Sequence, residues 1–383
     1  MNQEQPPYVQ VTDRSHLARV AARLAREPVI GVDLEADSMF HYQEKVCLLQ
    51  ISSPSENILV DPLLVKDLSP LAPVFLDPGV RKVFHGADYD IRSLYRDFGI
   101  QVRGLFDTQI AARFLGMRET SLASLLLVRL GVVVEKKHQK KDWSVRPLPP
   151  AMLNYAVRDT CHLIRLSRML EKELGEKGRA FCVEEECERL CRVRPASPDQ
   201  GPLFLKFKGA GKLDRRGLAL LESLLQWREE TARLKDVPPF KILGNEPVLE
   251  IVNRKPLREK DLEGIHGLST KQSGRLARTI IAKTEEALRL GEDGLPKYPR
   301  NARTPIPAKV SRRIKALKEW RETRAAEMGM EASLVCTNAQ IESLALACPR
   351  RRRDLEGIDA LRNWQKKLFG SEICAILKNL DTP

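Results

Sequence analysis

Short apolar runs alternate with helix-like segments in the first half of the chain. Strands are predicted at residues 29–34, 46–51, 57–60, 81–85 and 105–106. Helical spacing of apolar residues is found at residues 91–98, 110–115, 122–130 and 152–174, and Gly99 ends the first of these runs. Such alternation is typical of an α/β domain, here with a mixed sheet and covering helices.

The second half of the chain is helical in pattern and repeats itself at an offset of 93 residues. Trp227-Arg228-Glu229 returns as Trp320-Arg321-Glu322, and residues 261–265 return unchanged as residues 354–358. Segments rich in proline and glycine, at residues 192–211 and 291–307, separate these parts. We therefore expect three domains: an α/β domain at 1–200 and two small all-α domains at 211–292 and 308–383.

Composition places the chain among soluble globular proteins, with 43% hydrophobic and 30% charged residues. No apolar run approaches the roughly 20 residues that a membrane-spanning helix needs. Eight cysteines among 383 residues are too dilute for a disulfide framework, which favours free thiols in a reducing compartment. A cytoplasmic location is the resulting expectation.

The net charge of +13 is concentrated in the second half of the chain. Residues 1–200 sum to +1 and residues 201–383 to +12. A near-neutral domain followed by a basic one favours a reaction domain joined to a part that holds a polyanion. A basic surface that is simply solvated is the alternative.

Two acids, Asp33 and Glu35, stand two positions apart at the end of a predicted strand. The two-residue period of a strand directs both side chains to one face. Like charges in that arrangement repel unless a cation lies between them, and a divalent metal ion is the simplest candidate. The alternative is that the strand ends at Val32 and both acids are solvated.

Two further segments carry candidate ligands. Tyr155 and Asp159 are four residues apart and would share one face of a helix. With an ordinary pKa of about 10 the phenol is a poor base, although it can position a water molecule. Asp90 follows a turn that begins at His85, and the helix dipole alone would explain an acid there, whether Asp88 or Asp90.

The order of these motifs carries more information than any one of them. Asp33-x-Glu35, then His85 with Tyr89-Asp90, then Tyr155 with Asp159 match in order the three motifs of the DEDD exonucleases. The chain resembles the DEDDy branch and, within it, the ribonuclease D family, over residues 11–174. The tandem repeat resembles two HRDC domains. One departure is His85, where many members of the superfamily carry asparagine.

This resemblance implies a ribonuclease-H-like fold and a metal-dependent 3′→5′ exoribonuclease. It implies two divalent ions, Mg²⁺ or Mn²⁺, held by Asp33, Glu35, Asp90 and Asp159, with Tyr155 orienting a water molecule. Oxygen ligands suit such ions, and two ions roughly 4 Å apart can stabilise both the attacking and the leaving oxygen. Nucleoside 5′-monophosphates from structured RNA, transfer-RNA precursors above all, are the implied products and substrates. A DNA exonuclease and a non-catalytic nucleic-acid-binding scaffold are the alternatives.

Candidate RNA contacts lie outside the acidic motifs. They are His85, Lys140, Lys141, Trp143, Arg146, Arg350, Arg351 and Arg352. Lys140 and Lys141 belong to a basic run from Lys136, which a solvated loop would also explain. Trp143 could stack on a base or simply pack. Four consecutive arginines from Arg350 cannot all face inward, so part of that run should be exposed to phosphates.

A fifth acid, Asp107, precedes a predicted helix at the end of a strand. Asp107 or Thr108 is expected to cap that helix by accepting its free backbone N–H groups, in preference to a role in metal binding. Trp227 and Trp320 occupy equivalent positions in the two repeats, which favours packing over base stacking. Cys182, Cys187 and Cys191 lack the spacing of a zinc site and are expected to be thiols along one helix.

Overall fold

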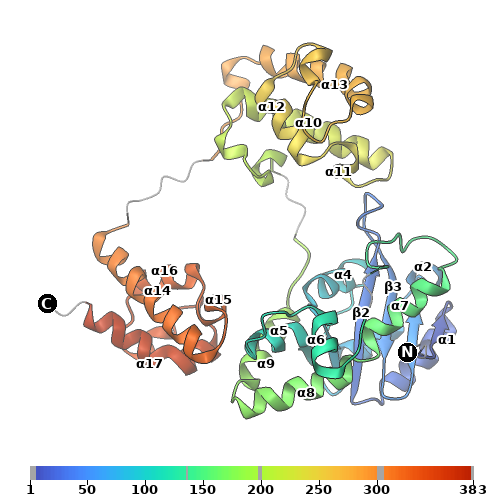
Figure 1. The fold of residues 1–383 in the computed structure, drawn as a ribbon, viewed down its shortest axis with the longest axis vertical. Helices are drawn as coiled ribbons and strands as arrows, with labels where there is room; N and C mark the ends of the chain where they lie inside the picture. Colours follow the sequence, from blue (N-terminus) through green and yellow to red (C-terminus); the bar gives the residue numbers. More distant parts are fainter. Residues whose placement is uncertain (1–5, 135–136, 197–200, 300–305, 381–383) are drawn as a thin grey trace. The chain divides into compact units, whose positions relative to one another are not determined.

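A computed structural model describes residues 6–134, 137–196, 201–299 and 306–380 (Figure 1). These residues fall into two compact units. The first unit joins the sheet-containing part of the chain, up to residue 195 and without residues 37–45, to the C-terminal helices. The second unit joins residues 37–45 to the helical residues up to 299.

The first unit contains a six-stranded mixed sheet. Its strands are β1 Val9–Val11, β2 Val29–Ala36, β3 Val46–Ser52, β4 Asn57–Val60, β5 Arg81–Phe84 and β6 Leu105–Asp107. Their order across the sheet is β1-β4-β3-β2-β5-β6. β3 runs antiparallel to β2 and β4, whereas the pairs β1 with β4, β2 with β5 and β5 with β6 are parallel. The predicted α/β class with a mixed sheet is confirmed.

Helices cover this sheet. They are α1 Arg14–Leu24, α2 Pro62–Val65, α3 Ala72–Leu76, α4 Asp88–Phe98, α5 Thr108–Phe114, α6 Leu122–Leu130, α7 Pro150–Thr160, α8 Leu163–Glu176 and α9 Ala180–Leu190, with one 3₁₀ turn, η1 Ser69–Leu71. Every residue of β3 is buried, as expected for a central strand covered on both faces. Gly99 ends α4 in the left-handed conformation (φ 65°), the backbone state that glycine adopts at least cost.

The observed elements differ from the sequence-based expectations in two respects, and they decide one alternative. The short strand β1 was not predicted, because only Val11 of its three residues is buried and leaves little pattern. Helix α1 was missed although its buried residues, Leu17, Val20, Ala21 and Leu24, recur at helical spacing. The helix predicted at residues 152–174 is two helices, α7 and α8, separated by Cys161 and His162. β2 continues to Ala36, so Asp33 and Glu35 lie inside the strand and the alternative of a strand ending at Val32 is excluded.

The two helical repeats have the same succession of elements. The first has α10 Arg215–Leu234, α11 Pro239–Ile242, α12 Asn245–Arg254, η4 Glu259–Leu262 and α13 Thr270–Arg289; the second has α14 Ala308–Met328, α15 Ala332–Val335, α16 Asn338–Ala347, η6 Arg352–Leu355 and α17 Asn363–Asn379. The remaining 3₁₀ turns are η2 Leu203–Lys206, η3 Ala210–Lys212 and η5 Glu292–Gly294.

Equivalent hydrogen bonds support the duplication. The Arg228 guanidinium donates to the Asn245 side-chain oxygen at 2.7 Å, and Arg321 donates to Asn338 at 2.9 Å. Lys255 and Cys348, again 93 residues apart, both end a helix in the left-handed conformation. The two copies therefore share their internal contacts as well as their helices.

The remaining composition-based expectations concern cysteines and membranes. All eight cysteines are free thiols, with Cys182 and Cys187 buried on α9. Trp227 and Trp320 both pack against the hydrophobic cores of their repeats, as predicted. Among the described residues, none of the helices combines the length and apolar character that crossing a membrane requires.

Candidate active site

Asp33 and Glu35 project from the part of β2 that lies beyond its pairing with β5. β5 pairs only with Val29–Gly31, whereas β3 stays paired along the strand as far as Ala36. Strand alternation places both carboxylates on one face, as predicted. Each borders a cavity of about 330 Å³.

A glycine brings a second element against this strand. An added Cβ at Gly31 would lie 3.0 Å from the Thr160 carbonyl oxygen and 3.2 Å from Leu163 Cβ. The junction between α7 and α8 therefore rests directly on β2, which no larger residue would allow without displacement. This close approach carries Asp159, the residue before Thr160, to the acids of β2.

The three carboxylates meet at one point. One oxygen each from Asp33, Glu35 and Asp159 lie within 4.8 Å of one another, as metal ligands would. Tyr155, one helical turn before Asp159 on α7, hydrogen-bonds the Asp159 carboxylate. The four residues come from two elements that are more than a hundred positions apart in the chain.

Asp90 lies on α4 and is buried, with 6% of its surface exposed. It is not part of the 4.8 Å cluster, but its charge interacts with those of Asp33 and Glu35. The α4 N-terminus that carries it follows the turn at Gly86, whose φ of 74° favours glycine. All four predicted acids thus belong to one electrostatic environment.

Asp107 holds that turn in place. Its carboxylate accepts N–H groups from Gln109 and Ile110 at 2.8 and 3.1 Å, which is the predicted cap of α5. It also accepts the N–H groups of Gly86 and Ala87 at 3.0 and 2.8 Å. No local pattern indicates these last two contacts, because they join positions 21 and 20 residues apart.

Burial raises the pKa of all four acids, and repulsion between them adds to the effect at three. Burial raises the pKa of Asp33 to about 7. Burial and the charges of Asp33, Asp159 and Asp90 raise the pKa of Glu35 to about 10. Burial, followed by repulsion from Asp33, also raises the pKa values of Asp90 and Asp159 well above the usual range. The cluster therefore carries a large electrostatic cost that cations would relieve.

Tyr155 is kept in its neutral form. Burial and the neighbouring acids, Asp159 first, raise its pKa above the ordinary value. The ring lies 6.2 Å from that of Trp143 and 5.8 Å from that of His138, measured between centroids. At neutral pH the phenol is thus a fixed hydrogen-bond donor and not a base.

Several residues that line the cavity were not identified from the sequence. Besides Asp33, Glu35, Tyr155 and Asp159 the cavity is lined by Leu34, His85, Gln109, Ser121, Leu122, Ala123, Val134, Gln139 and Leu163. His85 Nδ1 lies 2.9 Å from Thr108 Oγ1, and burial lowers the pKa of the imidazole. Polar residues such as Gln109 and Ser121 have no motif in this sequence, so only the fold could identify them.

Trp143 cannot stack on a base in this structure, because its side chain is fully buried. Of the two roles considered for it, packing is therefore the one observed. Arg146 is similarly occupied: its guanidinium makes a paired contact with Asp61 at 2.6 and 2.9 Å and also donates to the Trp143 and Cys47 carbonyls. That satisfied, half-buried guanidinium corrects the expectation of an RNA contact and gives Arg146 a structural role.

Unlike the buried Trp143 and the paired Arg146, the lysines of the basic run are exposed to solvent. Lys140 and Lys141 are exposed, next to Gln139 at the rim of the cavity, whereas Lys136 lies outside the described residues. Arg350, Arg351 and Arg352 are exposed on the second helical repeat. These residues stay candidates for phosphate contact.

Family models match the chain in three places. A 3′-5′ exonuclease family matches residues 8–175, and the HRDC domain matches twice, at residues 217–283 and 311–377. The exonuclease match contains every acid of the cluster. The two HRDC matches coincide with the helical repeats.

Full-length relatives share this arrangement. Ribonuclease D of Zymomonas mobilis is 31% identical over 96% of this chain and 93% of its own length. The crystal structure of Escherichia coli RNase D, an exoribonuclease involved in structured RNA processing, has a TM-score of 0.71 at 26% identity and covers 97% of this chain and 99% of its own. The catalytic core of RRP6 from Trypanosoma brucei follows with a TM-score of 0.63 at 30% identity, over 75% of this chain and 84% of its own.

Proposed function

The chain belongs to the ribonuclease D family of 3′→5′ exoribonucleases, and from that premise we propose that it trims structured RNA from its 3′ end. Transfer-RNA precursors are the proposed substrates, and nucleoside 5′-monophosphates the products. The observation that carries the proposal is the meeting of Asp33, Glu35 and Asp159 within 4.8 Å in a cavity that also holds Tyr155.

We propose that Asp33, Glu35, Asp90 and Asp159 hold two divalent metal ions, Mg²⁺ or Mn²⁺. The donor set fits, because all four are carboxylates and such ions prefer hard oxygen ligands. Burial raises the pKa of all four acids, and mutual repulsion adds to this for Glu35, Asp90 and Asp159, so a bound cation would offset an existing electrostatic cost. Such ions, when bound, supply charge neutralisation at the scissile phosphodiester and activation of water.

The protein's own groups would orient the reactants. Tyr155 stays protonated and donates its one O–H to Asp159, its neighbour on α7, so the fixed phenol oxygen can accept a hydrogen bond from the attacking water. His85 stays neutral at the cavity wall and can accept or donate a hydrogen bond to the terminal nucleotide. The exposed Lys140 and Lys141 would contact backbone phosphates beside the cavity.

The domain division proposed for this chain is a nuclease domain with its linker at 1–200 and helical domains at 211–292 and 308–383. The three segments that match family models fall inside these bounds. Cloned separately, residues 1–200 should keep metal-dependent cleavage of short RNA, because no residue of the acidic cluster lies beyond Asp159.

Trimming of 5′-labelled RNA and DNA of one sequence tests the proposed function. With Mg²⁺, the wild-type chain should shorten RNA from the 3′ end, and Asp33→Ala and Asp159→Ala should each slow this by about 100-fold or more. A preference for DNA would assign the chain to DNA exonucleases instead. Binding of RNA without any cleavage by the wild type would make it a scaffold.

A further inference from the structure

A basic groove lies on the second helical repeat, away from the acidic cluster. It is lined by Arg352, Arg353, Glu356, Asn363, Lys366 and Lys367 and has a volume of about 320 Å³. Four of these side chains are cationic and one is acidic. The groove is formed where the 3₁₀ turn η6 lies along the first turns of α17.

η6 lies directly against α17 at Gly370. An added Cβ at Gly370 would lie 2.9 Å from Leu355 Cδ1 and 3.8 Å from Arg352 Nε. Arginines of η6 and lysines of α17 are therefore held together although like charges repel. Arg353 has one weak partner, Asp354, at 3.9 Å, and its side chain is 71% exposed. A contact that long and exposed leaves the guanidinium available to an anion.

The first repeat serves as an internal comparison, because it has the same elements at an offset of 93 residues. The positions equivalent to the groove are Glu259, Lys260, Glu263, Thr270, Ser273 and Gly274. One cation there replaces four, and two acids replace one. The fold does not require the charges of the groove, so packing within the module does not explain them.

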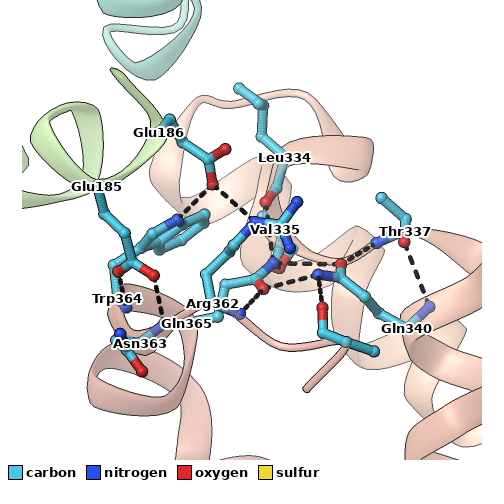
Figure 2. A network of polar contacts seen from close by, with 11 residues as sticks. Glu185, Glu186, Leu334, Val335, Thr337, Gln340, Arg362, Asn363, Trp364 and Gln365 are labelled. Atoms are coloured by element: carbon cyan, nitrogen blue, oxygen red, sulfur yellow. Dashed lines mark hydrogen bonds and ion pairs between the residues drawn. The ribbon is translucent and has the colours of Figure 1, made fainter. Parts of the chain in front are cut away.

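The start of α17, which contributes Asn363 to the groove, is attached to the nuclease domain through α9 (Figure 2). The Glu185 carboxylate accepts the backbone N–H groups of Asn363 and Trp364, both at 2.8 Å. Glu186 accepts the indole N–H of Trp364 at 2.9 Å and lies 3.3 Å from Arg362 Nε. Together these contacts attach the start of α17 to the nuclease domain.

Apolar contacts reinforce this attachment. The Trp364 ring meets Phe114 edge to face, with 5.2 Å between centroids, and Lys367 Nζ lies 4.2 Å from the centre of the Phe181 ring. Lys367 thus belongs both to the groove and to the contact with α9. In the first repeat a lysine, Lys271, takes the place of Trp364, so that copy lacks the aromatic anchor.

We propose that this groove binds the phosphate backbone of the body of a structured RNA while its 3′ end is at the acidic cluster. The proposal rests on the proposed exoribonuclease function and adds to it a place where the substrate is held. Lys and Arg side chains that converge on one groove suit a polyphosphate backbone, which requires no particular base sequence. Because the groove is attached to α9, it lies at a set position relative to the nuclease domain.

The groove also divides the run of four arginines. Arg352 and Arg353 line it, whereas Arg350 and Arg351, which are also exposed, do not. Phosphate contact within the groove is therefore assigned to Arg352 and Arg353, with Lys366 and Lys367.

A matched pair of charge reversals in the full chain tests the proposal. Arg353→Glu changes the groove, and Lys260→Glu makes the same change of net charge at the equivalent position of the first repeat. Binding of a structured RNA with a single-stranded 3′ tail is measured in chelator, where cleavage does not interfere. Arg353→Glu should weaken binding about tenfold and reduce the slope of log affinity against log salt by about 1, whereas Lys260→Glu should change both much less.

A second variant, Arg352→Glu with Lys366→Ser, installs residues that the first repeat already carries at these positions. It should fold, and its salt slope should fall by about 2. Trimming of a short unstructured RNA with Mg²⁺ is the parallel measurement, and Lys260→Glu should match the wild type. If Arg353→Glu weakens binding no more than Lys260→Glu, and the double variant binds as wild type, the groove is not an RNA site. Failure of the wild type to trim the short RNA would instead overturn the proposed function.

Discussion

The backbone N–H of Ala87 donates to the Asp107 carboxylate at 2.8 Å, which joins the turn before α4 to the start of α5. Because the same carboxylate caps α5, one side chain sets the position of two helix ends. α4 carries Asp90. Asp107 therefore acts as a positioning residue for Asp90, although it is not itself one of the four acids of the site.

Asp107→Asn should therefore impair catalysis as well as stability. Asparagine offers one acceptor oxygen in place of a carboxylate that receives four N–H groups, at a cost of about 2 kcal/mol in unfolding free energy. We expect the trimming rate to fall about tenfold and half-saturation to require more Mn²⁺. Asp13→Asn makes the same substitution at the N-cap of α1, which asparagine can also cap, and should leave the metal requirement unchanged. Equal Mn²⁺ dependence of the two variants would show that Asp107 only caps α5.

Stability without metal should fall as pH rises. Asp33 has a folded-state pKa of about 7, against an ordinary value of about 4 in the unfolded chain. Between these values the folded protein binds more protons than the unfolded one, so the free energy of unfolding decreases with increasing pH. In chelator the melting temperature should drop by about 5 °C from pH 5 to pH 7.5.

Two comparisons isolate the source of that drop. Asp33→Asn removes one of the titrating groups and should flatten the dependence on pH. Saturating Mg²⁺ should raise the melting temperature more at pH 7.5 than at pH 5, since ionised carboxylates bind the ion. A melting temperature of the chelated wild type that rises over this interval would refute the assigned pKa directions.

Trp364→Lys introduces the residue that the first repeat carries at the equivalent position. The buried indole packs against Phe114 and donates to Glu186, so its loss should cost about 3 kcal/mol. Calorimetry of the variant should resolve a separate, earlier transition for the second repeat. Lys271→Ala is the matching change in the first repeat and should leave the melting profile as it is; an unchanged profile for Trp364→Lys would mean that the anchor contributes little.

The sequence predicted which segments with sustained hydrophobic periodicity form helices or strands better than it predicted where they end or what they contact. Strand β4 and helix α6 have the predicted bounds, because each is a dense apolar run enclosed by polar residues. The break between α7 and α8 was missed, since apolar residues continue through it at helical spacing. The short strand β1 is held in the sheet by pairing with β4, a contact that no local sequence pattern indicates.

The candidate acids could be chosen from the sequence because the order of their motifs resembles a known family. Their meeting depends on Gly31, whose missing side chain lets the α7–α8 junction reach β2. The role of Asp107 in holding the turn at Gly86, and that of Trp364 in joining two domains, follow from tertiary contacts. For Trp364 one signal was present: its equivalent in an otherwise similar repeat is Lys271.

We propose that the carboxylates of Asp33, Glu35, Asp90 and Asp159 serve metal-dependent trimming of RNA from the 3′ end. Gel analysis of 5′-labelled RNA and of released nucleotide tests this with the wild-type chain, first in excess chelator and then with increasing Mg²⁺ or Mn²⁺. We expect no shortening in chelator, and stepwise 3′ shortening with release of nucleoside 5′-monophosphates once metal is added. Full activity in excess chelator would contradict it.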